Sequence, residues 1–193
     1  MAEPSNPSPE QVITKENFFV ITGGPGAGKT TIIQELQRRN FVTVPEIARQ
    51  IIQEQVLTNG NALPWADTGT YTELMLSRSI DSFLALDSCC VPAFCDRGIP
   101  DTLCYARIIK YPGIRTVELA CQQFRYNRRV FLLAPWKKIY KTDTERKQTF
   151  AEAIQVYQQM KRVYADCDYQ VCEVPIGPVS ARTDFILRLA ETP

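Results

Sequence analysis

The residue types and spacing best suited to chemistry lie between residues 23 and 31, where glycines surround a lysine and two threonines. Residues 23–30 fit the pattern G-x-x-x-x-G-K-[ST], a phosphate-binding loop. Glycine permits backbone conformations that a side chain forbids, so successive N–H groups can turn toward one polyphosphate at a helix N-terminus. We expect Lys29 to reach the terminal phosphates and the Thr30 hydroxyl to ligate Mg²⁺. The predicted nucleotide-binding residues are Gly23, Gly24, Pro25, Gly26, Ala27, Gly28, Lys29, Thr30 and Thr31.

A second group of residues that could take part in a reaction is the pair Asp96 and Arg97, which follows the apolar run 91–95. A carboxylate at the end of a buried strand suits the second acid of a Mg²⁺ site in phosphate-transfer enzymes. The alternative is an acidic turn residue. ATPases that hydrolyse with water usually place a carboxylate beside that aspartate, whereas Arg97 is a cation suited to holding phosphate or pairing with a carboxylate.

Glu46 is the third candidate, two residues beyond the apolar run 41–44. A carboxylate at this edge of a sheet can accept the proton of an attacking hydroxyl, which makes Glu46 a candidate catalytic base. Pro45 and Glu46 also suit the start of a helix, where a negative charge is stabilised by the helix dipole. Both interpretations stay open at this point.

Composition narrows the chemistry and the partners that the chain can have. Among 193 residues, 22 lysines and arginines balance 21 aspartates and glutamates, and the net charge of +1 favours neither nucleic acid nor membrane as a partner. Histidine is absent, so proton transfer falls to carboxylates, lysines, cysteines or tyrosines. The seven cysteines form no C-x-x-C pair, which predicts reduced thiols in a cytoplasmic protein and no zinc site. We find no apolar run of membrane-spanning length and no signal-peptide core.

The elements that must position these residues alternate along the chain. Apolar runs predict strands at 18–22, 41–44, 91–95, 130–133 and 169–174. Helical patterns lie between and after them, at 29–39, 46–57, 69–86, 101–110, 115–126, from about 149, and at 180–189. This alternation predicts one α/β domain, residues 17–193, with a five-stranded parallel sheet in a three-layer α/β/α sandwich. Residues 1–16 are expected to be a disordered leader. Ligands of such sheets bind at the carboxyl ends of the strands.

Two further segments follow predicted strands. Residues 134–148 form a polar stretch with the cations Lys137, Lys138, Lys141, Arg146 and Lys147. A run of charges is most often a solvated face, but a mobile lid would bring Arg146 to bound ATP and exclude water. The planar guanidinium suits that role because it can hold two phosphate oxygens. Residues 176–178 are expected to border the adenine, with Gly177 and Pro178 as contacts.

Residues 17–190 resemble the predicted ATPase/kinase family of AAA-type P-loop domains, which also contains bacterial nicotinamide riboside kinase domains. The resemblance is carried by ITGGPGAGKTT at 21–31, VPEIAR at 44–49, CDRGIPD at 95–101, residues 135–147 and VPIGP at 174–178. The arrangement is also similar to deoxyribonucleoside kinases, which place a catalytic glutamate after the second strand and an acid–arginine pair after the third. Glu46, Asp96 and Arg97 match those positions, and residues 137–147 correspond to the arginine-bearing lid. The pattern that selects a nucleobase is not recognisable.

These observations together predict a Mg²⁺- and ATP-dependent kinase of a small molecule, nucleoside- or riboside-like. The expected catalytic residues are Lys29, Glu46, Arg97 and Arg146, and the expected metal ligands are Thr30 and Asp96. The acceptor is expected between Glu46, Trp65 and the helix that begins near Gly69. A nucleotide-dependent ATPase switch on a protein partner is the competing prediction, and an inactive nucleotide-binding module is the third. The sequence indicates neither the acceptor nor the oligomeric state.

Overall fold

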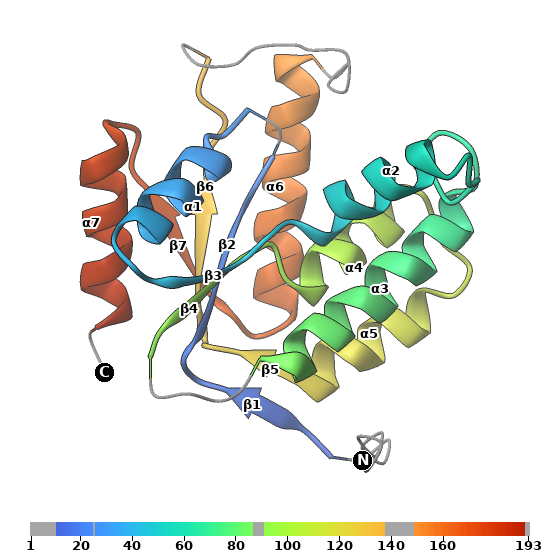
Figure 1. The fold of residues 1–193 in the computed structure, drawn as a ribbon, viewed down its shortest axis with the longest axis horizontal. Helices are drawn as coiled ribbons and strands as arrows, with labels where there is room; N and C mark the ends of the chain where they lie inside the picture. Colours follow the sequence, from blue (N-terminus) through green and yellow to red (C-terminus); the bar gives the residue numbers. More distant parts are fainter. Residues whose placement is uncertain (1–10, 25, 87–90, 138–148, 192–193) are drawn as a thin grey trace.

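The computed structural model describes residues 11–24, 26–86, 91–137 and 149–191, which form a sheet covered by helices on both faces (Figure 1). Along the chain the elements are β1 (Ile13–Lys15), β2 (Phe18–Gly23), α1 (Lys29–Arg38), β3 (Val42–Val44), α2 (Ile47–Leu57), α3 (Thr68–Ala85), β4 (Ala93–Asp96), α4 (Ile99–Ile108), α5 (Ile114–Gln123), β5 (Phe124–Tyr126), β6 (Arg129–Leu133), α6 (Phe150–Asp166), β7 (Gln170–Val174) and α7 (Val179–Ala190). None of these helices has the length and hydropathy to cross a membrane.

The main sheet has five parallel strands in the order β3-β4-β2-β6-β7, which confirms the predicted fold class. Strand β2 is central and pairs with β4 on one side and β6 on the other. The register sets Ile21 opposite Asp96 and Gly23 opposite Leu133. Because the strands are parallel, the loops after β2, β3 and β4 leave the sheet at one edge.

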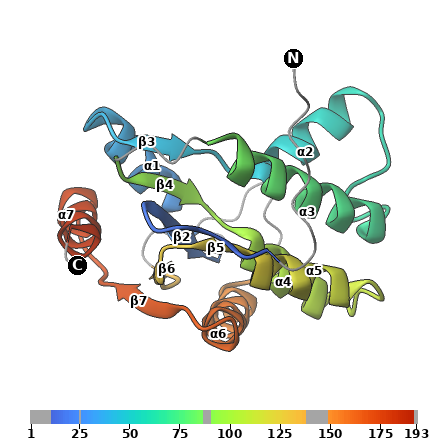
Figure 2. The ribbon, with the colours of Figure 1, turned by 90° about the horizontal axis from the view of Figure 1, so that it is seen from below.

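The central strands are apolar throughout because both faces of the sheet are covered. Side chains alternate along β2, so Phe18 and Val20 pack toward α3, α4, α5 and α6, while Phe19 and Ile21 pack toward α1 and α7. Figure 2 shows these two groups of helices on opposite sides of the sheet. A smaller cluster of Ile51, Tyr71 and Met75 joins α2 to α3 beside the main core.

The structure corrects the predicted leader and the predicted helix at residues 115–126. Residues 13–15 form β1, which pairs in parallel with β5 in a separate two-stranded sheet, so β5 replaces the end of that helix. Lys15 also ties β1 to the end of α3, because its ammonium donates to the carbonyl oxygens of Phe83, at 2.6 Å, and Leu86. Residues 1–10 and most of the predicted lid, 138–148, lie outside the described residues.

Gly23 is a position where the packing of strands requires glycine. Its φ is +150°, and a Cβ added there would lie 2.6 Å from the carbonyl oxygen of Leu133 in β6. Gly23→Ala is therefore expected to lower the free energy of unfolding by about 1–3 kcal/mol. At Gly24 the nearest atom to an added Cβ is 3.4 Å away, so Gly24→Ala is a matched control expected within about 0.5 kcal/mol of wild type. Urea unfolding followed by circular dichroism measures both, and equal midpoints would contradict the expectation.

Candidate functional site

The phosphate-binding loop turns from the end of β2 into α1. Gly26 and Gly28 adopt positive φ values of 72° and 84°, conformations that side chains disfavour. Lys29, the first residue of α1, is only 8% exposed, and its Nζ donates to the carbonyl oxygen of Gly23 at 2.9 Å. Burial lowers the pKa of Lys29, and the nearby Arg97 lowers it further. Thr30 is exposed, whereas Pro25 lies outside the described residues.

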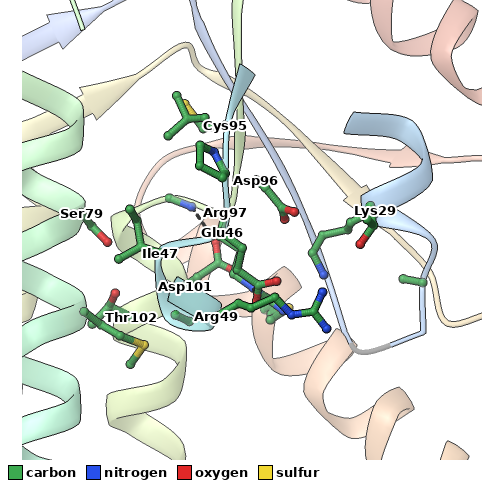
Figure 3. Close-up of a pocket in the computed structure, with 18 of the residues that line it drawn as sticks. Lys29, Glu46, Ile47, Arg49, Ser79, Cys95, Asp96, Arg97, Asp101 and Thr102 are labelled. Atoms are coloured by element: carbon green, nitrogen blue, oxygen red, sulfur yellow. Dashed lines mark hydrogen bonds and ion pairs between the residues drawn. The ribbon is translucent and has the colours of Figure 1, made fainter. Parts of the chain in front are cut away.

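A cavity of about 680 Å³ opens at the carboxyl edge of the sheet and brings most of the predicted site together. Its lining includes the predicted residues Gly26, Ala27, Gly28, Lys29, Thr30, Thr31, Glu46, Trp65, Asp96, Arg97 and Gly177. Gly23, Gly24 and Pro178 do not line it. Arg146, the remaining predicted catalytic residue, lies outside the described residues, and its role stays a prediction. Figure 3 shows Lys29, Glu46, Asp96 and Arg97 facing one another across the cavity.

Arg97 joins two carboxylates at the wall of this cavity. Its Nε donates to Oε1 of Glu46 at 2.7 Å, and its Nη1 donates to Oδ1 of Asp101 at 3.0 Å. Burial alone would lower the pKa of Arg97, but the charges of Glu46, Asp101 and Asp96 raise it well above its usual value. The guanidinium therefore stays charged and fixes Glu46 relative to the start of α4.

Glu46 is the residue directly before α2, but its side chain makes no capping hydrogen bond to that helix. Burial acts to raise the pKa of Glu46, yet the charges of Arg97 and Lys29 outweigh burial and hold it at about 2. The carboxylate is thus ionised at neutral pH and accepts hydrogen bonds at the cavity wall. This geometry favours the interpretation as a site residue over that of a helix-start charge, although the catalytic role itself stays a prediction.

Asp96 is a buried acid with a carboxylate oxygen that is free to bind a cation. It is 8% exposed, and its Oδ1 has no hydrogen-bond partner in the part of the chain that the structure describes. Burial raises the pKa of Asp96, an effect that Lys29 opposes and Glu46 reinforces. Mg²⁺ prefers oxygen ligands and keeps several waters and phosphate oxygens, so a carboxylate with one unpartnered oxygen, in the same cavity as the loop, fits such an ion. Within the described ranges, no group of three or more cysteine, aspartate or glutamate side chains lies close enough together to hold a metal ion.

Asp96→Asn is expected to raise the free energy of unfolding of the ligand-free protein near neutral pH, because burial disfavours the carboxylate. The folded-state pKa of Asp96 lies above the unfolded value of about 3.9. Protonated Asp96 therefore makes its full contribution to the free energy of unfolding below about pH 4, and this contribution is lost as the pH rises through the folded-state pKa. The gain should therefore be largest near pH 7 and vanish below about pH 4. Urea unfolding across this range measures it, with exposed Asp81→Asn as the control. A variant less stable than wild type at neutral pH would contradict the expectation.

The sequence analysis assigned no role to two buried residues that line the same cavity, Asp101 and Arg182. Asp101 accepts from the hydroxyls of Thr22 and Tyr164, both at 2.5 Å, and from the backbone N–H of Gly98 at 3.0 Å. Asp101 lies four residues after Arg97, within the run CDRGIPD at 95–101, but the predicted helix begins only at residue 101 and gave no reason to pair the two side chains. Arg182 lies in α7, and its contact with the loop has no counterpart in a local sequence pattern.

Comparisons with known proteins show the family and the fold of the chain. A family model described as an AAA domain matches residues 18–182. Among curated proteins, none matches the sequence. The structure is similar to NadR protein in complex with NR, with a TM-score of 0.69 and 14% identity over 93% of this chain and 52% of that chain. A second NadR structure, in complex with NAD and AMP-PNP, has a TM-score of 0.62 and 16% identity over 92% of this chain and 49% of that chain.

A further structural relative is deoxyadenosine kinase from M. mycoides with the products dCMP and dCDP. Its TM-score is 0.56, with 13% identity over 89% of this chain and 97% of that chain. At these identities the similarities show the fold alone, and the chain spans about half the length of the NadR chains that it matches. The family model, in contrast, covers most of the sequence. The chain therefore belongs to the AAA domain family of P-loop proteins.

Proposed function

We propose that this chain is an ATP- and Mg²⁺-dependent phosphotransferase that acts on a small hydroxyl-bearing molecule, nucleoside- or riboside-like. The observation that carries the proposal is the ion pair between Glu46 and Arg97, 2.7 Å long, in the same cavity as Lys29 and Asp96. Phosphoryl transfer needs mainly positioned groups and charge stabilisation. An ionised carboxylate held opposite a phosphate-binding lysine provides a place for an acceptor hydroxyl.

The cavity has room for an acceptor beside a nucleotide. Its volume of about 680 Å³ lies within the range of ligand pockets, about 300–1,000 Å³. Beyond Glu46 it continues along α3 and α4, where its lining includes Met75, Ser79, Thr102 and Tyr105. Trp65 also lines the cavity and is 65% exposed. An apolar wall with hydroxyl groups suits a small organic acceptor better than a protein segment.

The roles of the residues follow from their charges and positions. The loop N–H groups and Lys29 would bind the β- and γ-phosphates, and Glu46 would accept a hydrogen bond from the acceptor hydroxyl and orient it for attack. Because the pKa of Glu46 is about 2, orientation is its main contribution. Arg97 would hold Glu46 and neutralise charge on the transferring group. Asp96 and Thr30 would hold Mg²⁺, which supplies charge stabilisation at the phosphate oxygens.

The test is ATP consumption by the purified chain with Mg²⁺ against a panel of nucleosides, ribosides and vitamins. The printed ligands of the structural relatives, NR and dCMP, suggest where the panel begins. We expect one acceptor class to accelerate ATP consumption and to yield a monophosphate detectable by mass spectrometry. Hydrolysis that no small acceptor changes, but that a protein accelerates, would support the nucleotide-dependent switch. Absence of ATP binding would exclude both functions.

A further inference from the structure

Arg182 is a buried cation that has no acidic partner among the residues that the structure describes. It is 3% exposed, and its Nη2 donates to the carbonyl oxygen of Ala27 at 2.9 Å. Its Nε is buried and has no hydrogen-bond partner in the ranges that the structure describes. Burial lowers the pKa of Arg182, the direction expected when the surroundings do not neutralise a charge. The fold therefore holds a positive charge next to the phosphate-binding loop without compensating it.

A second guanidinium in the cavity lining, that of Arg97, shows the contrast. Arg97 bonds to the carboxylates of Glu46 and Asp101, and these charges raise its pKa well above the usual value. Buried charges in folded proteins are as a rule paired, because an unpaired ion loses its hydration without compensation. An anion that enters the cavity would compensate the charge of Arg182 as Glu46 and Asp101 compensate that of Arg97.

The position of Arg182 indicates which anion this is. Arg182 lines the same cavity as the loop, together with Gly177 and Val179 from the start of the same segment. Helices α1 and α7 cover the face of the sheet opposite to α3 and α4 (Figure 2). Arg182 therefore approaches the loop from the side opposite to Arg97, where residues 176–178 are expected to border the base.

We propose that Arg182 binds a phosphate oxygen of the bound nucleotide, at the end of the phosphate chain nearest to the nucleoside. This inference rests on the proposed nucleotide-dependent function and adds a binding residue that lies outside the loop pattern. The contact with Ala27 occupies one N–H of the planar guanidinium and fixes its orientation. Because Nε is itself buried, an anion would be held by the N–H groups of the terminal nitrogens Nη1 and Nη2 that this contact leaves unused, in a fork geometry.

The test is Arg182→Gln, which removes the positive charge but keeps a polar side chain that ends near the Nε position of the arginine. We expect the dissociation constants for ATP and ADP, measured by calorimetry, to rise by about 10- to 100-fold, as for loss of a charged hydrogen bond. The KM for ATP should rise by a similar factor, while kcat at saturating ATP changes little. The melting temperature of the ligand-free variant should equal or exceed that of wild type, since an uncompensated buried charge is removed. A purely structural contact predicts a lower melting temperature instead.

The matched control is Arg188→Gln, the same substitution at an exposed position of α7, which should bind ATP as wild type does. Unchanged ATP affinity in Arg182→Gln overturns the inference while leaving the proposed function intact. If that variant does not fold, Arg182→Lys is measured, which keeps the charge but not the planar fork, and unchanged affinity there also overturns it. Failure of the wild-type chain to bind ATP overturns this inference and the proposed function together.

Discussion

Replacing Lys29 by alanine is expected to lower the rate of ATP-dependent phosphoryl transfer by about 10³-fold, a loss of several kcal/mol of transition-state stabilisation. The ammonium is buried beside the loop and donates to the carbonyl oxygen of Gly23 at 2.9 Å. Burial lowers its pKa, so a bound polyphosphate compensates a charge that the fold itself disfavours. The variant should therefore remain folded while losing catalysis.

The measurement is kcat and KM for ATP in steady state, with circular dichroism to establish folding. Lys161→Ala is the control, because Lys161 is an exposed lysine of α6 that pairs with Glu173 at 2.5 Å, and it should turn over as wild type does. Wild-type turnover in Lys29→Ala would mean that the loop does not bind the transferred phosphate, and the assignment of the site would be wrong.

Glu46→Gln is expected to lower acceptor phosphorylation by about 10²-fold, the order of loss when an acceptor is no longer correctly positioned for attack. The amide has nearly the same shape and can still accept the hydrogen bond from Nε of Arg97, now 2.7 Å long. It cannot provide the negative charge that orients the acceptor hydroxyl. ATP affinity should change little, because the expected phosphate contacts come from the loop and Lys29.

The control for this substitution is Glu54→Gln in α2, the helix that follows Glu46. Glu54 also pairs with an arginine, Arg78, at 2.5 Å, but it is not part of the cavity lining. Because the pKa of Glu46 is about 2, the pH profile of kcat/KM should show no ionisation of this residue above about pH 4. If Glu46→Gln keeps its turnover and only melts at a lower temperature, the glutamate is a structural charge and the mechanism lacks its orienting group.

Much of the fold follows from local patterns. The buried strands β2, β4 and β6 are continuous apolar runs, which the sequence displays directly because parallel strands covered on both faces need no polar side. The loop at residues 23–31 can also be predicted from the sequence, since its glycines, Lys29 and Thr30 lie close together in the chain. Because ligands bind at the carboxyl ends of parallel strands, the positions of Glu46, Asp96 and Arg97 after predicted strands then identify them as candidate site residues.

Contacts between distant parts of the chain were decided by the tertiary structure. Strand β1 lies in a segment whose polar, proline-containing composition predicted disorder, and it forms because β5 offers a partner edge. Arg97 meets Glu46 across 51 residues, and Arg182 meets Ala27 across 155. The sequence by itself determined the sheet and the phosphate-binding loop, because periodicity and local spacing encode them. Which charges are paired and which are left uncompensated depends on packing between elements, and a local pattern carries no information about that.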